Sequence, residues 1–224
     1  MDYGRTFHAH HRMTAAPVIA TPQLAALLQE RIGRNAGLAV PRLALEVWRA
    51  IRDEDWMLSA GTLHGWARKL WTFDRPYRHA GRELGTGTQI GTSLGVALAN
   101  KGSGRLVVDL QPDGDLMYDA GALWMAAKYQ IPLLIVMYNN RAYYNDWNHQ
   151  IVMARTRGTD PSRAHIGMDL FGPAPDFAGL ARSMGWWAEG PIDNADDLQP
   201  ALKRAVGQVK KGMPALVDAV TQHR

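Results

Sequence analysis

The sequence predicts an α/β fold with a doubly wound, mostly parallel sheet and helices on both faces. The composition is that of a compact chain with its own core, because 46% of the 224 residues are hydrophobic and 21% are charged. The most apolar segments, 133–138 and 214–220, have the length of strands and no polar alternation, as in strands buried on both faces. Segments with helical spacing separate the strand-like segments, which indicates parallel strands joined by helices.

The first expected helix begins at Pro41, which suits the first turn of a helix, and it ends at the acidic run 53–55. Leu43, Val47 and Ile51 form its apolar face. The elements expected after it are, in order, a short apolar run at 56–58, a helical stretch at 63–73, a glycine-rich turn at 81–91, a helix at 92–100, a strand at 106–110, a turn at 111–115, a helix at 116–129, a strand at 133–138, an irregular section at 139–175, a helix at 176–184, a strand at 186–189, a helix at 195–210 and a strand at 214–220.

The domain organisation is predicted to be an N-terminal extension at 1–38 and a single domain at 39–224. The extension has a histidine cluster at 7–11 and a helical stretch at 22–32. Histidines on a terminus without acidic or cysteine partners are more often solvated than metal-bound. Segment 14–22 is too short and too broken by proline for the apolar part of a secretion signal, so we expect a cytoplasmic protein, with an organelle transit peptide as the alternative.

Composition and charge exclude several classes of function. No run approaches the roughly 20 apolar residues of a membrane span, so no membrane association is expected. The net charge of +4 comes from 25 basic and 21 acidic residues that are scattered along the chain, so no nucleic-acid partner is expected either. The sequence has no cysteine, which excludes disulfides, thiolate-held zinc or iron–sulfur clusters and a cysteine nucleophile within it.

Polar loops follow two of the most apolar predicted strands. Asp113 and Gly114 lie directly after the strand at 106–110, and Asn140 lies directly after the strand at 133–138. One helix and one strand separate the two loops, which returns the chain to the same edge of the sheet, where ligands of doubly wound folds bind. A carboxylate and an amide oxygen there suit a hard cation such as Mg²⁺, and Gly114 lets a phosphate approach the backbone.

Three other interpretations of these segments are possible. Proline, aspartate and glycine are typical turn residues, so 111–115 could be a turn without a ligand, and Asn139-Asn140 could be a polar strand end. A calcium-binding loop that starts at Asp109 lacks its last ligand, because Ala120 stands there, and its first residue lies in a strand. A dinucleotide-binding loop at 85–90 has Ile90 in place of its third glycine and no strand directly before it.

The pair Asp113-Gly114 and Asn139-Asn140 at this spacing resembles the cofactor-binding signature of the thiamine-diphosphate-dependent enzymes, the pyruvate decarboxylase and acetolactate synthase superfamily. The resemblance is to their C-terminal, pyrophosphate-binding domain, and it covers most of 39–221. The signature usually reads Gly-Asp-Gly, and Pro112 replaces the first glycine here. The metal ligand is therefore kept, while the local turn geometry differs.

The resemblance implies specific contacts to Mg²⁺ and thiamine diphosphate. Asp113 and Asn140 would ligate Mg²⁺ through their side chains, and Ala142 would do so through its backbone carbonyl. Gly114 and Asp115 would lie against the diphosphate. Because Asn140 and Ala142 hold the metal of the same complex, they are also expected to contribute to cofactor binding.

A second segment, Thr88-Gln89-Ile90-Gly91, resembles the family's Gly-Ser-Ile-Gly or Gly-Thr-Met-Gly sequence. The resemblance implies that Ile90 wedges between the two rings of the cofactor and keeps it in the bent, reactive conformation. It also implies that the backbone carbonyl of Thr88 accepts a hydrogen bond from the cofactor's amino group.

Two further sites are expected to border the cofactor. Gly61 and Trp66 resemble the ends of the family's Gly-x-x-x-x-Trp stretch, in which Gly61 and Thr62 would flank the diphosphate. Tyr143 is expected to contact the cofactor from the loop after Asn140. With its aromatic neighbours in that loop it suggests an aromatic-walled substrate pocket, although aromatic loop residues are as often packing residues.

Asp146 is the candidate proton-transfer residue. In the decarboxylase branch of the family an acid assists catalysis at this distance after the second asparagine, and Asp146 stands at that position with a side chain one methylene shorter than the usual glutamate. The alternative is a solvated loop acid or a helix cap. His149 is a weaker candidate, because a lone histidine in an aromatic loop is more often structural.

The resemblance implies an enzyme that cleaves or forms a C–C bond next to a carbonyl, either a 2-oxo acid decarboxylase or an acetolactate synthase-like carboligase or lyase. Its substrate would be a small 2-oxo acid, a 2-hydroxy-ketone or an acyl-CoA. In this family a glutamate of a separate pyrimidine-binding domain activates the cofactor, and no second α/β unit fits into residues 1–35. We therefore expect a heteromer, a heterotetramer or larger, in which a partner subunit supplies that glutamate.

Two alternatives to this function are weighed. The pyrophosphate-domain subunit of a 2-oxo acid oxidoreductase resembles cluster-binding proteins with ligating cysteines, and this sequence has no cysteine. A non-catalytic assembly or regulatory subunit could retain the fold. It would have no reason to keep both Asp113 and Asn140.

Overall fold

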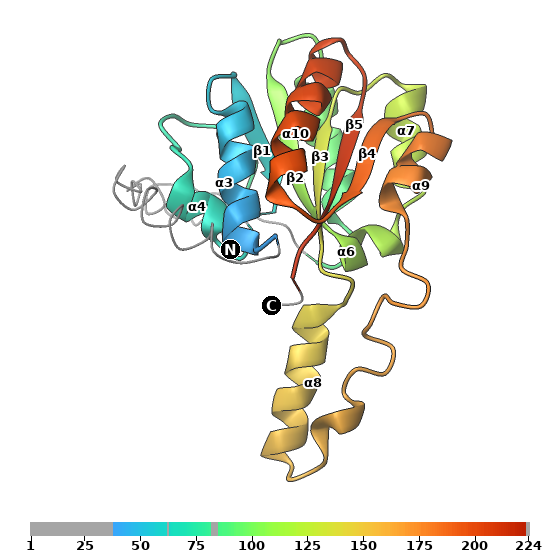
Figure 1. Ribbon diagram of the computed structural model, residues 1–224. Helices are drawn as coiled ribbons and strands as arrows, with labels where there is room; N and C mark the ends of the chain where they lie inside the picture. The colour runs from blue at the N-terminus through green and yellow to red at the C-terminus, as the bar shows by residue number, and fades with distance from the viewer. Residues whose placement is uncertain (1–37, 62, 82–84, 223–224) are drawn as a thin grey trace, which may run out of the picture.

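The computed structural model describes residues 38–61, 63–81 and 85–222. The predicted histidine cluster, the helical stretch at 22–32 and Thr62 lie outside the described residues, and the domain boundary at residue 38 stays a prediction. The described chain forms one five-stranded parallel sheet in the order β1-β2-β3-β5-β4. Figure 1 shows helices on both of its faces. The predicted α/β fold is confirmed.

The strands are short and apolar. Their bounds are β1 Trp56–Ala60, β2 Leu106–Pro112, β3 Leu134–Asn139, β4 Trp187–Ile192 and β5 Ala215–Val220. The residues of β3 are all buried, as expected for the central strand of a covered sheet. The register pairs Pro112 with Tyr138 and Asn139 with Val220, so the carboxyl ends of β2, β3 and β5 lie side by side.

Alternate side chains of the sheet enter two separate hydrophobic layers. Val108 and Val136 belong to the layer covered by α3 (Val40–Ile51), α4 (Trp66–Leu70) and α10 (Ala195–Lys210). Val107 and Ile135 belong to the layer covered by α5 (Gln89–Ala99), α7 (Ala122–Lys128) and α9 (Phe177–Ser183). The sheet therefore has a packed core on each face, which holds its carboxyl edge in place.

The helix predicted at 116–129 is two helices. α6 (Asp113–Tyr118) begins three residues earlier than predicted, and α7 follows after a break at 119–121. Asp119 and Gly121 lie at this break, and both have low helix propensity. As a result Asp113 lies in the first turn of a helix and not in a turn before one.

The section predicted to be irregular contains a helix, α8 (Tyr144–Thr156), and a short 3-10 turn, η1 (Pro161–Arg163). None of the residues of α8 is buried. Figure 1 shows α8 running away from the carboxyl edge of the sheet, with the returning chain beside it. A helix without a buried face has no apolar periodicity, which is why this helix was not predicted.

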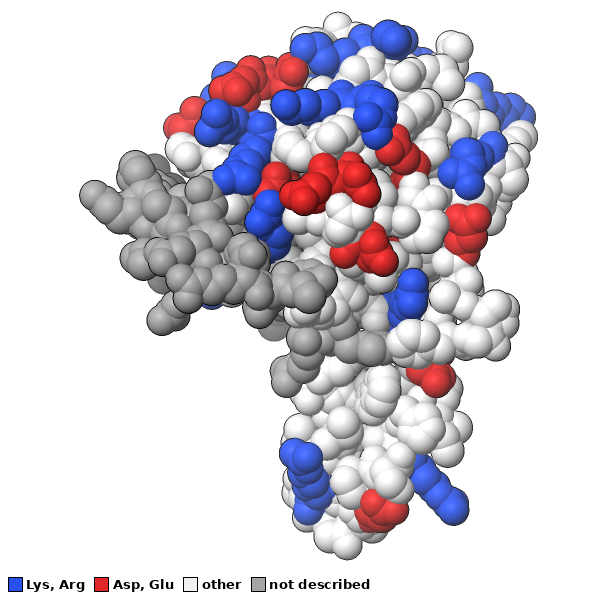
Figure 2. All heavy atoms as spheres, viewed as in Figure 1, with Lys and Arg blue, Asp and Glu red and all other residues white. Residues whose placement is uncertain are grey.

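Charges on the α3 and α10 side of the molecule are mixed. Figure 2 shows acidic and basic side chains interspersed over this face, without a field of one sign. Arg42 and Arg49 both pair with the buried Glu46 there, for example. No helix within the described ranges is long and apolar enough to cross a membrane.

Candidate functional site

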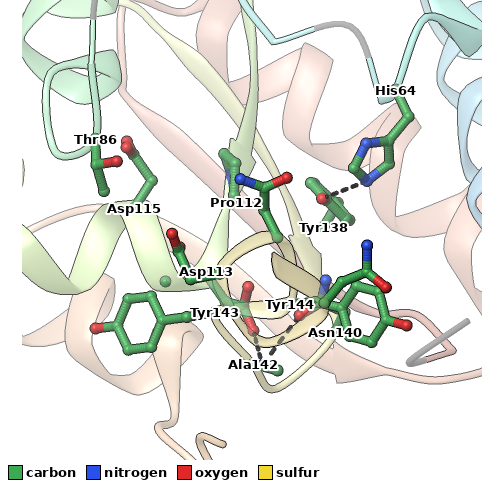
Figure 3. A pocket seen from close by; sticks show the side chains of 14 residues that line it. His64, Thr86, Pro112, Asp113, Asp115, Tyr138, Asn140, Ala142, Tyr143 and Tyr144 are labelled. Carbon is green, nitrogen blue, oxygen red and sulfur yellow. Dashed lines mark hydrogen bonds between the residues drawn. The ribbon is translucent and has the colours of Figure 1, made fainter. Parts of the chain in front are cut away.

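A cavity of about 350 Å³ opens at the carboxyl ends of β2 and β3 (Figure 3). It lies where doubly wound sheets bind their ligands. Its lining residues are His64, Thr86, Pro112, Asp113, Gly114, Asp115, Tyr138, Asn140, Ala142, Tyr143, Tyr144, Asn145, Asp146 and Asn148. Both predicted polar loops therefore contribute to one pocket.

The candidate metal ligands converge on one point. Asp113 Oδ2 and Asn140 Oδ1 both accept a hydrogen bond from the backbone N–H of Ala142, at 3.2 and 3.0 Å. Arg141, which lies between Asn140 and Ala142, has a left-handed backbone with φ of 59°. This turns the chain back toward Asp113. A carboxylate oxygen and an amide oxygen that meet in this way fit a hard cation such as Mg²⁺. Ala142 makes this contact through its N–H, and ligation by its carbonyl stays a prediction.

The electrostatics of Asp113 agree with a ligand role. The side chain is 1% exposed, and this burial raises its pKa to about 6, although backbone N–H groups including that of Gly114 hold the pKa lower than burial alone would. A buried carboxylate is stabilised by a cation that binds to it. The residues present therefore fit a divalent metal.

Gly114 is required by the side chain that packs against it. A Cβ atom at this position would lie 2.6 Å from Cδ1 of Tyr143, closer than real side chains come. Tyr143 in turn packs edge-on against Tyr118, with ring centroids 5.7 Å apart, and its N–H donates to the carbonyl of Met168 at 2.8 Å. Gly114 and Tyr143 thus form one closely packed wall of the pocket.

Asp115 connects the second predicted segment to the pocket. Its Oδ1 accepts from the backbone N–H of Gly87 at 2.5 Å, and its Oδ2 accepts from Nε2 of Gln111 at 2.9 Å. These bonds hold the glycine-rich segment at the end of β2. Thr86 of that segment lines the pocket, whereas Thr88 does not.

The role of Ile90 between the two rings of the cofactor stays a prediction. Ile90 is fully buried in the hydrophobic layer with α7 and α9, and it does not line the cavity. The reason is that α5 begins at Gln89, which places Ile90 on the same buried helix face as Ser93 and Ala97. In this structure the side chain has no exposed surface with which to contact a cofactor.

Contact of Gly61 with the diphosphate also stays a prediction. Gly61 directly follows β1 with φ of 75°, and a Cβ atom there would lie 2.2 Å from the carbonyl oxygen of Leu110. Gly61 is therefore explained by close packing against β2. It is not among the residues that line the cavity.

His64 and Tyr138 are pocket residues that the sequence did not reveal. His64 Nε2 lies 2.8 Å from the hydroxyl of Tyr138. Burial, and secondly the negative charge of Asp113, raise the pKa of Tyr138 to about 12, so its hydroxyl stays protonated. Leu63, His64 and Gly65 all have left-handed backbones, with φ of 49°, 54° and 84°. This turn aims His64 into the pocket, and nothing in the residue pattern predicted it.

Asp146 lies in the first turn of α8 and not in a loop. It lines the main cavity and also a neighbouring cavity of about 360 Å³, so it stands between the two. The residues of the second cavity are Tyr118, Tyr143, Asp146, His149, Gln150, Gly167 and Met168. Proton transfer by Asp146 stays a prediction.

Comparison with known families identifies the domain. Residues 59–219 match the family described as thiamine pyrophosphate enzyme, C-terminal TPP binding domain. This chain belongs to that family. The resemblance found in the sequence is confirmed, and thiamine diphosphate, which is the same compound as TPP, is the cofactor for which this domain type is named.

Relatives of this TPP-binding chain include a Mycobacterium tuberculosis (strain ATCC 25618 / H37Rv) protein named as an acetolactate synthase large subunit. It is 30% identical over 135 residues, which are 60% of this chain and 25% of that protein. The structure is also similar to a thiamine diphosphate-dependent 4-hydroxybenzoylformate decarboxylase from Rhodococcus jostii RHA1, with a TM-score of 0.67 and 25% identity over 84% of this chain and 33% of that one. A benzoylformate decarboxylase from Polynucleobacter necessarius shares the fold, with a TM-score of 0.61 and 21% identity over 81% of this chain and 33% of the other. The TPP-binding chain thus spans a quarter to a third of the length of these proteins.

Proposed function

We propose that this chain is the thiamine-diphosphate- and Mg²⁺-binding subunit of a heteromeric enzyme that cleaves or forms a C–C bond next to a carbonyl. The observation that carries the proposal is the convergence of Asp113 Oδ2 and Asn140 Oδ1 on one N–H, at the edge of the sheet where ligands bind. Both oxygens belong to buried side chains, so they are held in place before any cation arrives.

The roles of the pocket residues follow from their positions. Asp113 and Asn140 would hold Mg²⁺, and the imidazole of His64, held by Tyr138, can donate an N–H to a phosphate oxygen. Thiamine diphosphate, when bound, supplies a carbanion that adds to the substrate carbonyl and takes up the electrons of the breaking bond. Asp146, which lines the same cavity, would hold or release a proton.

Activation of the cofactor is assigned to a partner subunit with a pyrimidine-binding domain, in a heterotetramer or larger assembly. No glutamate lines the described part of the pocket, and its acids are Asp113, Asp115 and Asp146. Asp113 faces the metal position, and Asp115 is engaged by Gly87 and Gln111. This supports a glutamate supplied from outside the domain.

A small 2-oxo acid is the substrate class that we favour, ahead of a 2-hydroxy-ketone or an acyl-CoA. The similar Rhodococcus jostii protein is named for decarboxylation of a 2-oxo acid. The second cavity here has the rings of Tyr118 and Tyr143 in its wall, beside Asp146. A flat side chain of a 2-oxo acid fits such a surface.

The test is turnover after mixing. The purified chain is combined with candidate partner chains that carry a pyrimidine-binding domain, and CO₂ release from pyruvate and benzoylformate is followed with thiamine diphosphate and Mg²⁺. Activity is expected in the mixture, and we expect its loss in Asp113→Ala but not in Glu46→Gln, a buried carboxylate on the α3 face. Full activity of the isolated chain would refute the need for a partner.

A further inference from the structure

Asp218 is a buried carboxylate that the proposed metal site does not use. It lies in β5, is 0% exposed, and stands beside the carboxyl end of β3. Its Oδ1 accepts a hydrogen bond from Nδ2 of Asn139 at 3.0 Å, whereas Oδ2 has no hydrogen-bond partner among the described residues. Burying a carboxylate oxygen without a hydrogen-bond donor costs folding free energy, so such a group is more often kept for a role other than stability.

Asn139 connects this carboxylate to the metal-binding loop. Asn139 is the last residue of β3 and is 2% exposed, and its Oδ1 accepts from the backbone N–H of Arg141 at 3.2 Å. Arg141 has the left-handed backbone that lies between Asn140 and Ala142. A residue other than glycine holds this conformation when its surroundings enforce it. The side chain of Asn139 is one such constraint.

The carboxylate also decides which way the amide of Asn139 points. A carboxylate oxygen accepts hydrogen bonds, so it selects the NH₂ end of the Asn139 amide and leaves the oxygen for Arg141. Gly190 of β4 packs closely against Asp218, because a Cβ atom at Gly190 would lie 2.7 Å from the Cβ of Asp218. The contacts therefore run from Asp218 in β5, through the amide of Asn139, to the backbone N–H of Arg141 in the loop.

We propose that Asp218 is a positioning residue for the metal site, which fixes the turn at Arg141 through Asn139 and so sets the place of the Asn140 oxygen relative to Asp113. The inference rests on the proposed function for the metal itself. It adds a residue of β5 to a site whose ligands directly follow β2 and β3. The alternative is that Asp218 contributes to the stability of the domain alone.

The test measures metal affinity and folding separately in the full chain. Mn²⁺, observed by electron paramagnetic resonance in the presence of thiamine diphosphate, stands in for Mg²⁺. Asp218→Asn keeps the shape of the side chain but allows the Asn139 amide to reverse, so Mn²⁺ affinity is expected to fall by about 10- to 100-fold. Asn139→Ala is expected to cause a similar loss, and the double variant no further loss, because the two residues act in series.

Glu46→Gln is the matched control. Glu46 is also buried and also accepts from an amide, Nε2 of Gln199 at 2.8 Å, but on the α3 and α10 side of the sheet. Its substitution is expected to lower the unfolding midpoint and leave Mn²⁺ affinity unchanged. In metal-free protein, the amide hydrogen of Arg141 should exchange faster in Asp218→Asn than in wild type, and at the wild-type rate in Glu46→Gln.

The outcomes separate the two proposals. In one outcome, wild-type protein binds Mn²⁺ and Asp113→Ala does not, while folded Asp218→Asn and Asn139→Ala bind it as wild type does. This outcome overturns the role of Asp218 and supports the metal site. Wild-type protein that binds no Mn²⁺ overturns the metal site and the positioning role together. Unchanged exchange of the Arg141 amide in Asp218→Asn also overturns the inference, whatever the metal result.

Discussion

Asp113 is both a candidate metal ligand and a carboxyl group whose pKa is raised to about 6, chiefly by burial. A cation binds the deprotonated form, so binding must displace the proton at low pH. Affinity for Mg²⁺ is therefore expected to fall by about tenfold per pH unit below pH 6 and to level off above pH 7. Calorimetric titration in buffers of different ionisation enthalpy measures the released proton. Affinity that stays constant between pH 5 and pH 6 would contradict this prediction.

Stability without metal should depend on pH through the same group. The folded pKa of Asp113 lies above its ordinary value of 3.8, and burial likewise raises that of Asp218 to about 6. Between these values the folded state binds more protons than the unfolded state, so the free energy of unfolding falls as pH rises from about 4 to about 6, by up to about 1.4 kcal/mol per pH unit for each group. Urea unfolding of wild type and Asp113→Asn isolates the Asp113 share, and the variant should show the shallower slope.

Gly114→Ala tests the packed wall of the pocket. The backbone at Gly114 is helical, so alanine alone would be favoured by up to about 1 kcal/mol, but the clash with the ring of Tyr143 costs about 1–3 kcal/mol. We expect net destabilisation and weaker binding of thiamine diphosphate. Gly121→Ala is the control, because a Cβ atom there meets open space. Equal behaviour of the two variants in urea unfolding and cofactor titration would show that the wall is not rigid.

Among individual residues, those that directly follow a predicted strand could be placed in the pocket from the sequence. Those whose position depends on local backbone angles or on the exact start of a helix could not. Asp113 and Asn140 were predictable because parallel strands bring their carboxyl ends together. His64 was not, since a left-handed turn places it. The burial of Ile90 was not predictable either, because α5 begins at Gln89, three residues before the predicted start, and this turns the side chain toward the core.

Among the elements, α8 differs from the others in having no buried residue. A helix with no buried residue opens locally at little cost to the rest of the domain. Gln150→Pro in α8 should lower the free energy of unfolding by less than about 1 kcal/mol. Gln208→Pro in α10, which packs on the sheet, should cost about 3 kcal/mol or more. Urea unfolding compares the two, and a large loss for Gln150→Pro would show that α8 is coupled to the core.

The helix with a buried apolar face could be predicted from the sequence, and the helix without one could not. α10 has an apolar face and a capping residue, Asn194, whose side chain accepts from the N–H of Asp197, and its predicted bounds agree with the structure. α8 has neither, and it was missed. The break between α6 and α7 was missed as well, because apolar residues at helical spacing continue across it.

Binding at the proposed metal site should be coupled to global unfolding, since the site joins loops that follow strands at the centre of the sheet. A ligand that binds only the folded chain stabilises it by about 2.7 kcal/mol at one hundred times its dissociation constant. Mg²⁺ with thiamine diphosphate should therefore raise the melting temperature of wild type. Calorimetry of Asp113→Ala should show no such rise, and an equal rise would place the binding elsewhere.

The parallel sheet and its two covered faces were predictable from strands that are apolar throughout. The strand order was not, because the crossover that inserts β5 between β3 and β4 depends on the packing of α9 and α10, and these helices have no directional signal in the residue pattern.

The hydrogen bond between Asn139 and Asp218 joins positions 79 residues apart. β5 is the last strand of the sheet, so during synthesis it is the last to leave the ribosome. A nascent chain carries Asp113 and Asn140 long before it carries the residue that we expect to hold their loop. Tight cation binding would then begin only when the domain is nearly complete, which would keep a half-made chain from capturing metal.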